Sequence, residues 1–103
     1  MIIYQVDCTV PNDVETEWRE WMMNEHISDV MNTEMFESFT MHRVVKPVLE
    51  NHTVYSIQYA TDSIGNYERY RLDFAPVLQQ AHKAKFGDAI TAERCVMETI
   101  GNG

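Results

Sequence analysis

The sequence has few residues of the kinds whose spacing identifies a chemistry. Its two cysteines, Cys8 and Cys95, lie far apart and match no metal-binding or redox spacing. The four glycines are scattered and form no phosphate-binding loop, and no serine or cysteine stands in a nucleophile-elbow context. Hydrolase and phosphoryl-transfer functions therefore have no support, and we expect both cysteines to be reduced, small and buried.

Basic residues and long apolar runs are also scarce. Eight basic residues against 16 acidic ones give a net charge of -8, which disfavours binding to phosphate backbones and to anionic membrane surfaces. No apolar run approaches the roughly 20 residues of a membrane-spanning helix. The segment Met1–Val6 has neither the basic region nor the cleavage site of a signal peptide. We therefore expect a soluble, cytoplasmic protein that binds neither nucleic acid nor membranes.

What the chain does have is enough apolar surface to fold, since 45% of its residues are hydrophobic and 11% are aromatic. A chain of 103 residues has room for one domain, so residues 1–103 are expected to form a single α+β domain. Residues 2–10 alternate with a period of two, which is typical of a strand with one more apolar face. The apolar set is Ile2, Tyr4, Val6, Cys8 and Val10.

The next segment has the apolar spacing of a helix whose buried face changes part-way. Asn12 followed by Glu15 predicts a capping box at its start. At about 100° per residue, the first apolar group lies well round the cylinder from the second, so one straight helix cannot bury both. We expect a kink or restart around Asn24-Glu25-His26 and an end near Asn32. The two groups are Val14, Trp18, Trp21 and Met22, and then Ile27, Val30 and Met31.

Three further runs predict strands. Residues 39–45 and 53–59 are rich in β-branched and aromatic side chains, and the short polar turn at 46–51 between them indicates a hairpin. Residues 90–100 form the last strand of the chain.

A second helix lies between the hairpin and the last strand. Asp62 and Ser63 can cap its start, and Pro76 must break or kink it because proline donates no backbone hydrogen bond. Pro76 is well suited to begin a restarted helix that reaches Phe86, with Gly87 ending it. Both predicted helices are therefore kinked.

The order strand-helix-strand-strand-helix-strand predicts a ferredoxin-like βαββαβ fold, with the first and third strands central and the fourth beside the first. Two helices can cover only one face of a four-stranded antiparallel sheet, so the other face is solvated or meets a partner. The uncovered face mixes polar and apolar side chains. Solvent would tolerate this mixture, and so would a dimer interior in which Asp7 pairs with Arg94. Long strands and few charges favour the homodimer. The residues assigned to this face are Ile3, Gln5, Asp7, Thr9, Val54, Ser56, Gln58, Ala60, Arg94 and Val96.

Motifs spread over nearly the whole chain occur in the order of one family. They are Met1-Ile2-Ile3-Tyr4, Trp18-Arg19-Glu20-Trp21-Met22 leading to Glu25-His26-Ile27, Tyr55-Ser56-Ile57-Gln58-Tyr59, Tyr67-Glu68-Arg69-Tyr70, Ala75-Pro76, and His82 with Phe86. The chain thus resembles the domain-of-unknown-function family 4286. The resemblance implies a dimeric α+β barrel in which two sheets face each other, and no established activity. In one departure, Phe74 stands where the family pattern has a histidine before Ala-Pro, so a role resting on that histidine does not carry over.

His26 is the candidate catalytic residue, because it follows a tryptophan-rich helix face at the point where the periodicity breaks. An imidazole with a pKa near 6.5 could act there as a general base or an orienting donor; alternatively, it is structural and bonds a carbonyl at a bend. A metal bound by His26 and His82 would need a third ligand, and Glu25 points about 100° away. We predict no metal and no cofactor.

Aromatic side chains are numerous for so small a domain, and several should converge between the helices and the apolar sheet face. Rings with hydroxyl or indole groups suit a pocket for a flat or hydrophobic ligand, although the same rings often form a core. The candidate binding residues are Tyr4, Trp18, Tyr59, Tyr70 and His82.

Three functions remain open from the sequence. The first is a homodimer that binds a small apolar or aromatic molecule between helices and sheet. The second is a cofactor-independent oxygenase or isomerase-like enzyme, by analogy with other dimeric α+β barrels. The third is a non-catalytic dimeric interaction module without a pocket.

Overall fold

The computed structural model describes residues 1–103. Four antiparallel strands form one sheet in the spatial order β2-β3-β1-β4. The strands are β1 (Ile2–Pro11), β2 (Ser38–Arg43), β3 (His52–Thr61) and β4 (Thr91–Glu98). This order confirms the predicted ferredoxin-like α+β fold, with the first and third strands central and the fourth strand beside the first.

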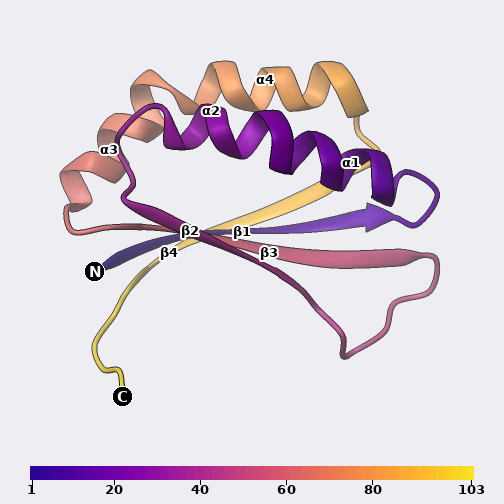
Figure 1. Cartoon of the computed structure of the whole chain (residues 1–103), viewed down its shortest axis with the longest axis horizontal. Coiled ribbons are helices and arrows are strands. Elements are labelled where there is room, and N and C mark those ends of the chain that lie inside the picture. Colours follow the sequence, from indigo (N-terminus) through magenta and orange to yellow (C-terminus); the bar gives the residue numbers. More distant parts are fainter.

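All helices lie on one face of this sheet, in two arms (Figure 1). The first arm consists of α1 (Glu15–Trp21), the π-helical turn η1 (Met22–His26) and α2 (Ile27–Met31). The second arm consists of α3 (Ile64–Asp73) and α4 (Ala75–Phe86). No helix is both long enough and apolar enough to cross a membrane. The opposite face of the sheet carries no helix, as predicted.

The first arm buries both of its apolar groups because the π-helical turn lies between them, at the place where a kink was predicted. A π-turn contains more residues per turn than an α-helix, so each of its residues advances by less than 100° around the axis. The apolar residues of α2 are thereby turned back toward the sheet. Trp18, Met22, Ile27 and Val30 are each no more than 3% exposed.

The start of the first arm differs from the prediction. Val14 precedes α1, and no side chain caps the helix. The Asn12 side chain instead accepts a hydrogen bond of 2.8 Å from the Thr53 hydroxyl. Glu15 forms an ion pair of 3.2 Å with Arg19. The predicted capping box is therefore wrong, because contacts with β3 and within α1 engage both side chains.

The second arm begins, breaks and ends where its sequence indicates. Ser63 caps α3, since its hydroxyl accepts a hydrogen bond of 3.2 Å from the Asn66 backbone N–H. The helix breaks at Phe74, and α4 starts with Pro76 in its first turn, where a missing N–H costs nothing. Gly87 ends α4 at a φ of 63°, a conformation that glycine adopts without strain.

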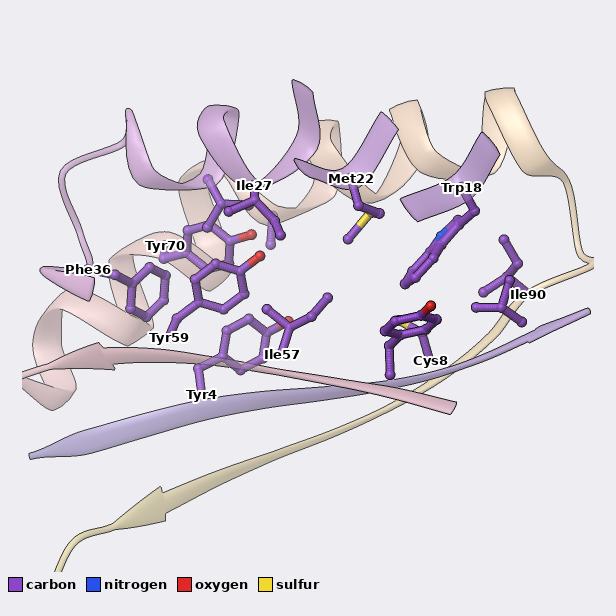
Figure 2. Packing of buried hydrophobic residues seen from close by; sticks show 14 residues of the cluster. Tyr4, Cys8, Trp18, Met22, Ile27, Phe36, Ile57, Tyr59, Tyr70 and Ile90 are labelled. Carbon is purple, nitrogen blue, oxygen red and sulfur yellow. The ribbon is translucent and has the colours of Figure 1, made fainter. Parts of the chain in front are cut away.

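The core lies between the two arms and the covered face of the sheet (Figure 2). Three tyrosines and Phe36 gather at one end of it, while Trp18 and Cys8 lie at the other. Burial of these large rings removes much apolar area from water and so helps to hold the arms on the sheet. The 14 core residues are Tyr4, Cys8, Val10, Trp18, Met22, Ile27, Val30, Phe36, Tyr55, Ile57, Tyr59, Tyr70, Ala75 and Ile90.

Strand register decides which residues lie on the bare face, because directly opposite residues of antiparallel neighbours share a face. The four opposite pairs that β1 and β3 place there are Ile3 with Ala60, Gln5 with Gln58, Asp7 with Ser56 and Thr9 with Val54. These assignments of β1 and β3 are confirmed. The bare face thus mixes apolar and polar side chains.

The assignment of β4 is wrong. Arg94 stands opposite Val6 and therefore faces the helices, as does Val96, which is also opposite a helix-facing residue of β1. Asp7 is opposite Glu93 on the other face, so the expected pairing of Asp7 with Arg94 is wrong as well. The two alternating sets of β4, Ala92-Arg94-Val96 and Glu93-Cys95-Met97, each contain apolar and charged residues. Hydrophobic alternation alone cannot choose between such sets.

Candidate functional site

Two histidines and two tryptophans meet where the helical arms contact each other. Trp18 Nε1–H donates a hydrogen bond of 2.9 Å to His82 Nε2, linking α1 to α4. The Trp21 ring centroid lies 5.2 Å from that of His26 and 5.8 Å from that of His82. The two imidazole centroids are 6.0 Å apart. The π-turn and α4 thus bring the two predicted histidines together.

The hydrogen bond from Trp18 defines the protonation state of His82. Because Nε2 accepts a hydrogen bond, the proton of the neutral ring must be on Nδ1. Burial, and then the nearby charge of Arg94, lowers the pKa of His82 below its usual range. His82 is therefore a neutral imidazole with one tautomer selected.

His26 is the last residue of η1 and is also neutral. Burial, followed by repulsion from His82, lowers the pKa of His26 to about 4. At neutral pH the ring therefore offers one acceptor nitrogen and one N–H donor. A base of this strength is well below the value near 7 that is best for general-base catalysis, so the geometry favours hydrogen bonding to a bound molecule.

A group of tyrosines fills the other end of the core (Figure 2). Tyr4 is at its centre, with ring centroids 5.9 Å from Tyr59, 5.2 Å from Tyr67 and 5.8 Å from Tyr70. Burial raises the pKa of Tyr4, and likewise the pKa of Tyr59 and of Tyr70. These hydroxyls remain protonated and are available as hydrogen-bond donors and acceptors.

Three small cavities lie along Arg94, and the tyrosines line two of them. We call them the Arg94 cavities because Arg94 and Gln79 line all three. The largest has a volume of about 150 Å³ and is bounded by Tyr67, Tyr70 and Ala75. The other two, of about 60 and 30 Å³, are both lined by His26. An engineered cavity of roughly 150 Å³ binds benzene, whereas roughly 30 Å³ corresponds to one water molecule. Only the largest has room for a ring.

The predicted site residues are largely brought together. Tyr4, His26, Tyr59 and Tyr70 line one of the Arg94 cavities, and His82 lines another with His26. Trp18 is the exception: it is 0% exposed and lines none of the cavities, so it can act on them only through His82.

The lining residues that were not predicted include three with polar groups that matter for ligand binding: Arg94, Gln79 and Tyr67. Tyr67 carried a usable signal, because it precedes Tyr70 by three positions and therefore shares its helix face. Gln79 lies on an exposed part of α4 that gives no such signal. Arg94 could be placed only by knowing the alternation phase of β4, which its sequence leaves open.

The structure offers no metal-binding cluster, and its largest groove lies away from this site. No three His, Cys, Asp or Glu side chains lie close enough together to hold a metal ion. A groove of about 610 Å³ runs beside the edge strand β2, between α1 and the Met41 side chain. Its two arginines, Arg19 and Arg43, both contact the Glu15 carboxylate, at 3.2 and 3.7 Å.

Solved structures share this architecture at low sequence identity. A dimeric ferredoxin-like protein from an uncultured marine organism is 12% identical with a TM-score of 0.69, covering 100% of this chain and 98% of its own. A mutant of SnoaB, a cofactor-independent oxygenase from Streptomyces nogalater, is 13% identical with a TM-score of 0.67, covering 98% and 95%. An ethyl tert-butyl ether d (ethd) family protein from Bacillus halodurans is 14% identical with a TM-score of 0.67, covering 97% and 100%. The TM-scores show that these proteins share the fold of this chain, and at such low identities the similarity shows nothing beyond the fold.

Sequence comparison gives the family. No protein of curated function matches the chain in sequence. The family model described as domain of unknown function DUF4286 matches residues 1–100, nearly the full length. This match confirms the resemblance seen in the sequence motifs, and the chain belongs to the DUF4286 family.

Proposed function

We propose that this protein is a homodimer that binds a small ring-containing molecule in the Arg94 cavities. The observation that carries the proposal is the 150 Å³ cavity, which is walled by tyrosine rings and adjoins the neutral His26 through Arg94 and Gln79. Aromatic walls with a few convergent polar groups are typical of small-molecule sites. In this proposal Tyr4 and Tyr70 contact the ring of the ligand, Tyr59 lines the small cavity beside it, and Trp18 positions His82.

His26 has a polar role in the proposal. Its neutral ring lines two of the three cavities, where it can accept a hydrogen bond from a ligand or donate one. Replacing His26 by Ala is expected to weaken binding modestly. If the bound molecule also reacts, turnover should fall far more than affinity.

The homodimer is supported by the fold and by the bare sheet face. One structural neighbour is described as a dimeric ferredoxin-like protein. On the bare face, Gln58 donates a hydrogen bond to Gln5, and Gln5 donates one to Asp7. Asp7 Oδ1 is buried without a hydrogen-bond partner, which is unusual for a carboxylate that faces only solvent. A molar mass in solution of twice 12.0 kDa is expected, and a monomer at micromolar concentration would refute the dimer.

We further propose a cytoplasmic location. Its support is that both cysteines are unpaired, as in proteins of reducing compartments. Fractionation of cells that express the protein tests this, and recovery outside the cytoplasmic fraction would contradict it.

Ligand binding is tested by thermal-shift screening of small aromatic compounds against the purified homodimer. Several should raise the melting temperature in a concentration-dependent way. Ala75→Met fills the 150 Å³ cavity and should abolish these shifts, while Ala81→Met, on the exposed side of the same helix, should keep them. Tyr67→Trp narrows the same cavity and replaces the first variant if that one does not fold. An absence of any stabilising compound would favour the interaction module.

Cofactor-independent oxygenation is a second candidate. It is favoured by an unprotonated imidazole and a guanidinium lining one cavity, and one structural neighbour is described as a cofactor-independent oxygenase. In this candidate His26 acts as a weak base, which suits only an acidic C–H group, and Arg94 stabilises the resulting anion. Oxygen uptake with enolisable ring compounds tests it: uptake should require His26. If His26→Ala leaves uptake unchanged, this candidate fails.

A further inference from the structure

Arg94 differs from every other arginine of the chain. Arg19 and Arg43 contact Glu15, Arg69 contacts Asp73 at 3.6 Å, and Arg71 contacts Glu68 at 2.9 Å. Arg94 has no carboxylate within 4.0 Å, although the chain has 16 acidic residues. Its recorded side-chain contact is a hydrogen bond of 3.2 Å from Nε to the Tyr4 hydroxyl.

The surroundings of Arg94 are equally free of negative charge. None of the residues lining the three Arg94 cavities is an aspartate or a glutamate. The lining contains a second cation, Arg71, whose charge is balanced by Glu68 on the exposed side of α3. The Tyr4 hydroxyl, which accepts the hydrogen bond from Arg94, is uncharged, and so are the Gln79 amide and the neutral His26 that line the same cavity. A guanidinium with five donors and one recorded partner therefore lines a cavity of ring size.

We propose that the Arg94 cavities recognise an anionic ring compound, with Arg94 pairing its carboxylate and the ring lying against Tyr4, Tyr67 and Tyr70. This inference rests on the proposed ligand-binding function and names the ligand class. Arginine presents two parallel N–H groups that match the two oxygens of a carboxylate, and such pairs are stronger than neutral hydrogen bonds. Gln79 supplies a further amide N–H at the same cavity.

The fit in size supports the same class. A volume of about 150 Å³ accommodates a single six-membered ring, and the adjoining smaller cavities continue along Arg94 toward His26. Tyrosine rings around a benzoate-sized ring gain offset and edge-to-face contacts. A purely structural role for Arg94, as the hydrogen-bond partner of Tyr4, predicts no preference for acids over their amides.

The test compares acids with neutral isosteres. Calorimetric titration of the homodimer with benzoate and phenylacetate is compared with benzamide and phenylacetamide. The acids should bind roughly 10- to 100-fold more tightly than the amides, as expected for a charge-assisted pair. Arg94→Gln should remove that preference, while Arg69→Gln, which makes the same charge change on an exposed helix face away from the cavities, should keep it. Arg94→Lys keeps the positive charge but lacks the two parallel N–H groups of the guanidinium, so it should retain part of the preference for acids.

The outcomes separate this inference from the function on which it rests. Equal binding of acids and amides, or an acid preference that survives Arg94→Gln, overturns the anionic class but leaves the ligand-binding site standing. If no acid or amide binds and the aromatic screen also finds nothing, both fall. Circular dichroism of each variant establishes that it is folded, and the exposed position of Arg94 makes folding of these variants the expected result.

Discussion

At the scale of single residues, the Trp18–His82 hydrogen bond and the partly buried His26 ring define the chemistry of the site. Trp18 donates to His82, and both His82 and His26 are kept neutral mainly by burial. Neutral imidazoles are compatible with the unpaired charge of Arg94, whereas imidazolium ions would repel it. The same burial links the protonation of both rings to the stability of the fold.

His26 should make the protein less stable as the pH falls from about 6.5 to about 4. In this window the unfolded chain binds a proton on His26 that the folded chain does not bind, since its folded pKa is about 4. The loss is up to about 3 kcal/mol, with His82 adding in the same direction. The lowered pKa of Glu15, chiefly due to the hydrogen bond from Tyr55, acts only below 4.5.

Urea unfolding at a series of pH values measures this effect. His26→Gln should have a shallower loss of unfolding free energy between pH 6.5 and 4 than the parent protein. His42→Gln removes an exposed histidine and serves as the matched control. Parallel profiles for the parent and His26→Gln would show that His26 is not held neutral by the fold.

The Trp18 indole should contribute more to stability than the Trp21 indole. Trp18→Phe removes buried volume and leaves His82 Nε2 without its donor, so we expect a loss of about 2–4 kcal/mol. Trp21→Phe is the matched change on the same helix; Trp21 is only partly buried and donates no recorded hydrogen bond, so its loss should be about half as large. Equal losses in chemical denaturation would contradict a structural role for the hydrogen bond.

At the scale of elements, the sequence predicted well whatever depended on clear periodicity. β1 and β3 alternate cleanly, and their faces are as predicted. The two incompatible faces of the first helix correctly placed a break at residues 24–26, although they did not indicate that it is a π-turn. β4 has apolar and charged residues in both alternating sets, so Arg94 was assigned to the wrong face.

Other features depend on contacts between distant segments, and local sequence does not determine them. The Asn12 side chain contacts Thr53 instead of capping its own helix. The site was predictable to the extent that its aromatic residues share helix or strand faces, as with His26, Tyr59 and Tyr70. The cavities themselves depend on how side-chain volumes from both arms fill the space above the sheet, which periodicity does not specify.

The π-turn should tolerate the loss of one residue, because it contains one more residue than an α-helical turn needs. Deleting Asn24, which is exposed, should convert η1 to an α-helix while Trp18 and Ile27 stay buried. We expect a stability loss of less than about 1 kcal/mol. Deleting the exposed Gln80 from the regular helix α4 should instead turn His82 and Phe86 away from the core and cost more than about 3 kcal/mol. If the two deletions cause comparable losses of unfolding free energy in urea, η1 does not contain one residue more than an α-helical turn needs.

At the scale of the whole molecule, the bare sheet face and the helix-covered face have different proposed roles. The bare face is the proposed dimer surface, and the covered face holds the ligand cavities. Each of these two faces of the sheet carries one cysteine, Cys8 on the covered face and Cys95 on the bare face. Cys8 is buried in the core as predicted, and burial raises its pKa to about 11. The prediction that Cys95 is buried is wrong, because Cys95 is exposed and stands opposite Gln5 on the bare face.

Thiol labelling should therefore depend on protein concentration at Cys95 only. Cys95 is expected to react slowly with iodoacetamide in the homodimer and faster after dilution to monomer, whereas Cys8 should stay unmodified until the protein unfolds. Mass spectrometry of peptides identifies the labelled residue, and Cys95→Ser should remove the fast phase. A labelling rate at Cys95 that is the same at all concentrations would contradict a dimer formed through this face.

The most direct test of the proposed function is a crystal structure of the protein grown with benzoate. We expect a two-fold dimer with facing sheets and benzoate in the largest of the Arg94 cavities, its carboxylate against Arg94 and its ring beside Tyr67 and Tyr70. Benzoate bound only elsewhere, or a cavity closed by the Arg94 and Tyr67 side chains with no space for a ring, would refute the proposed ligand site.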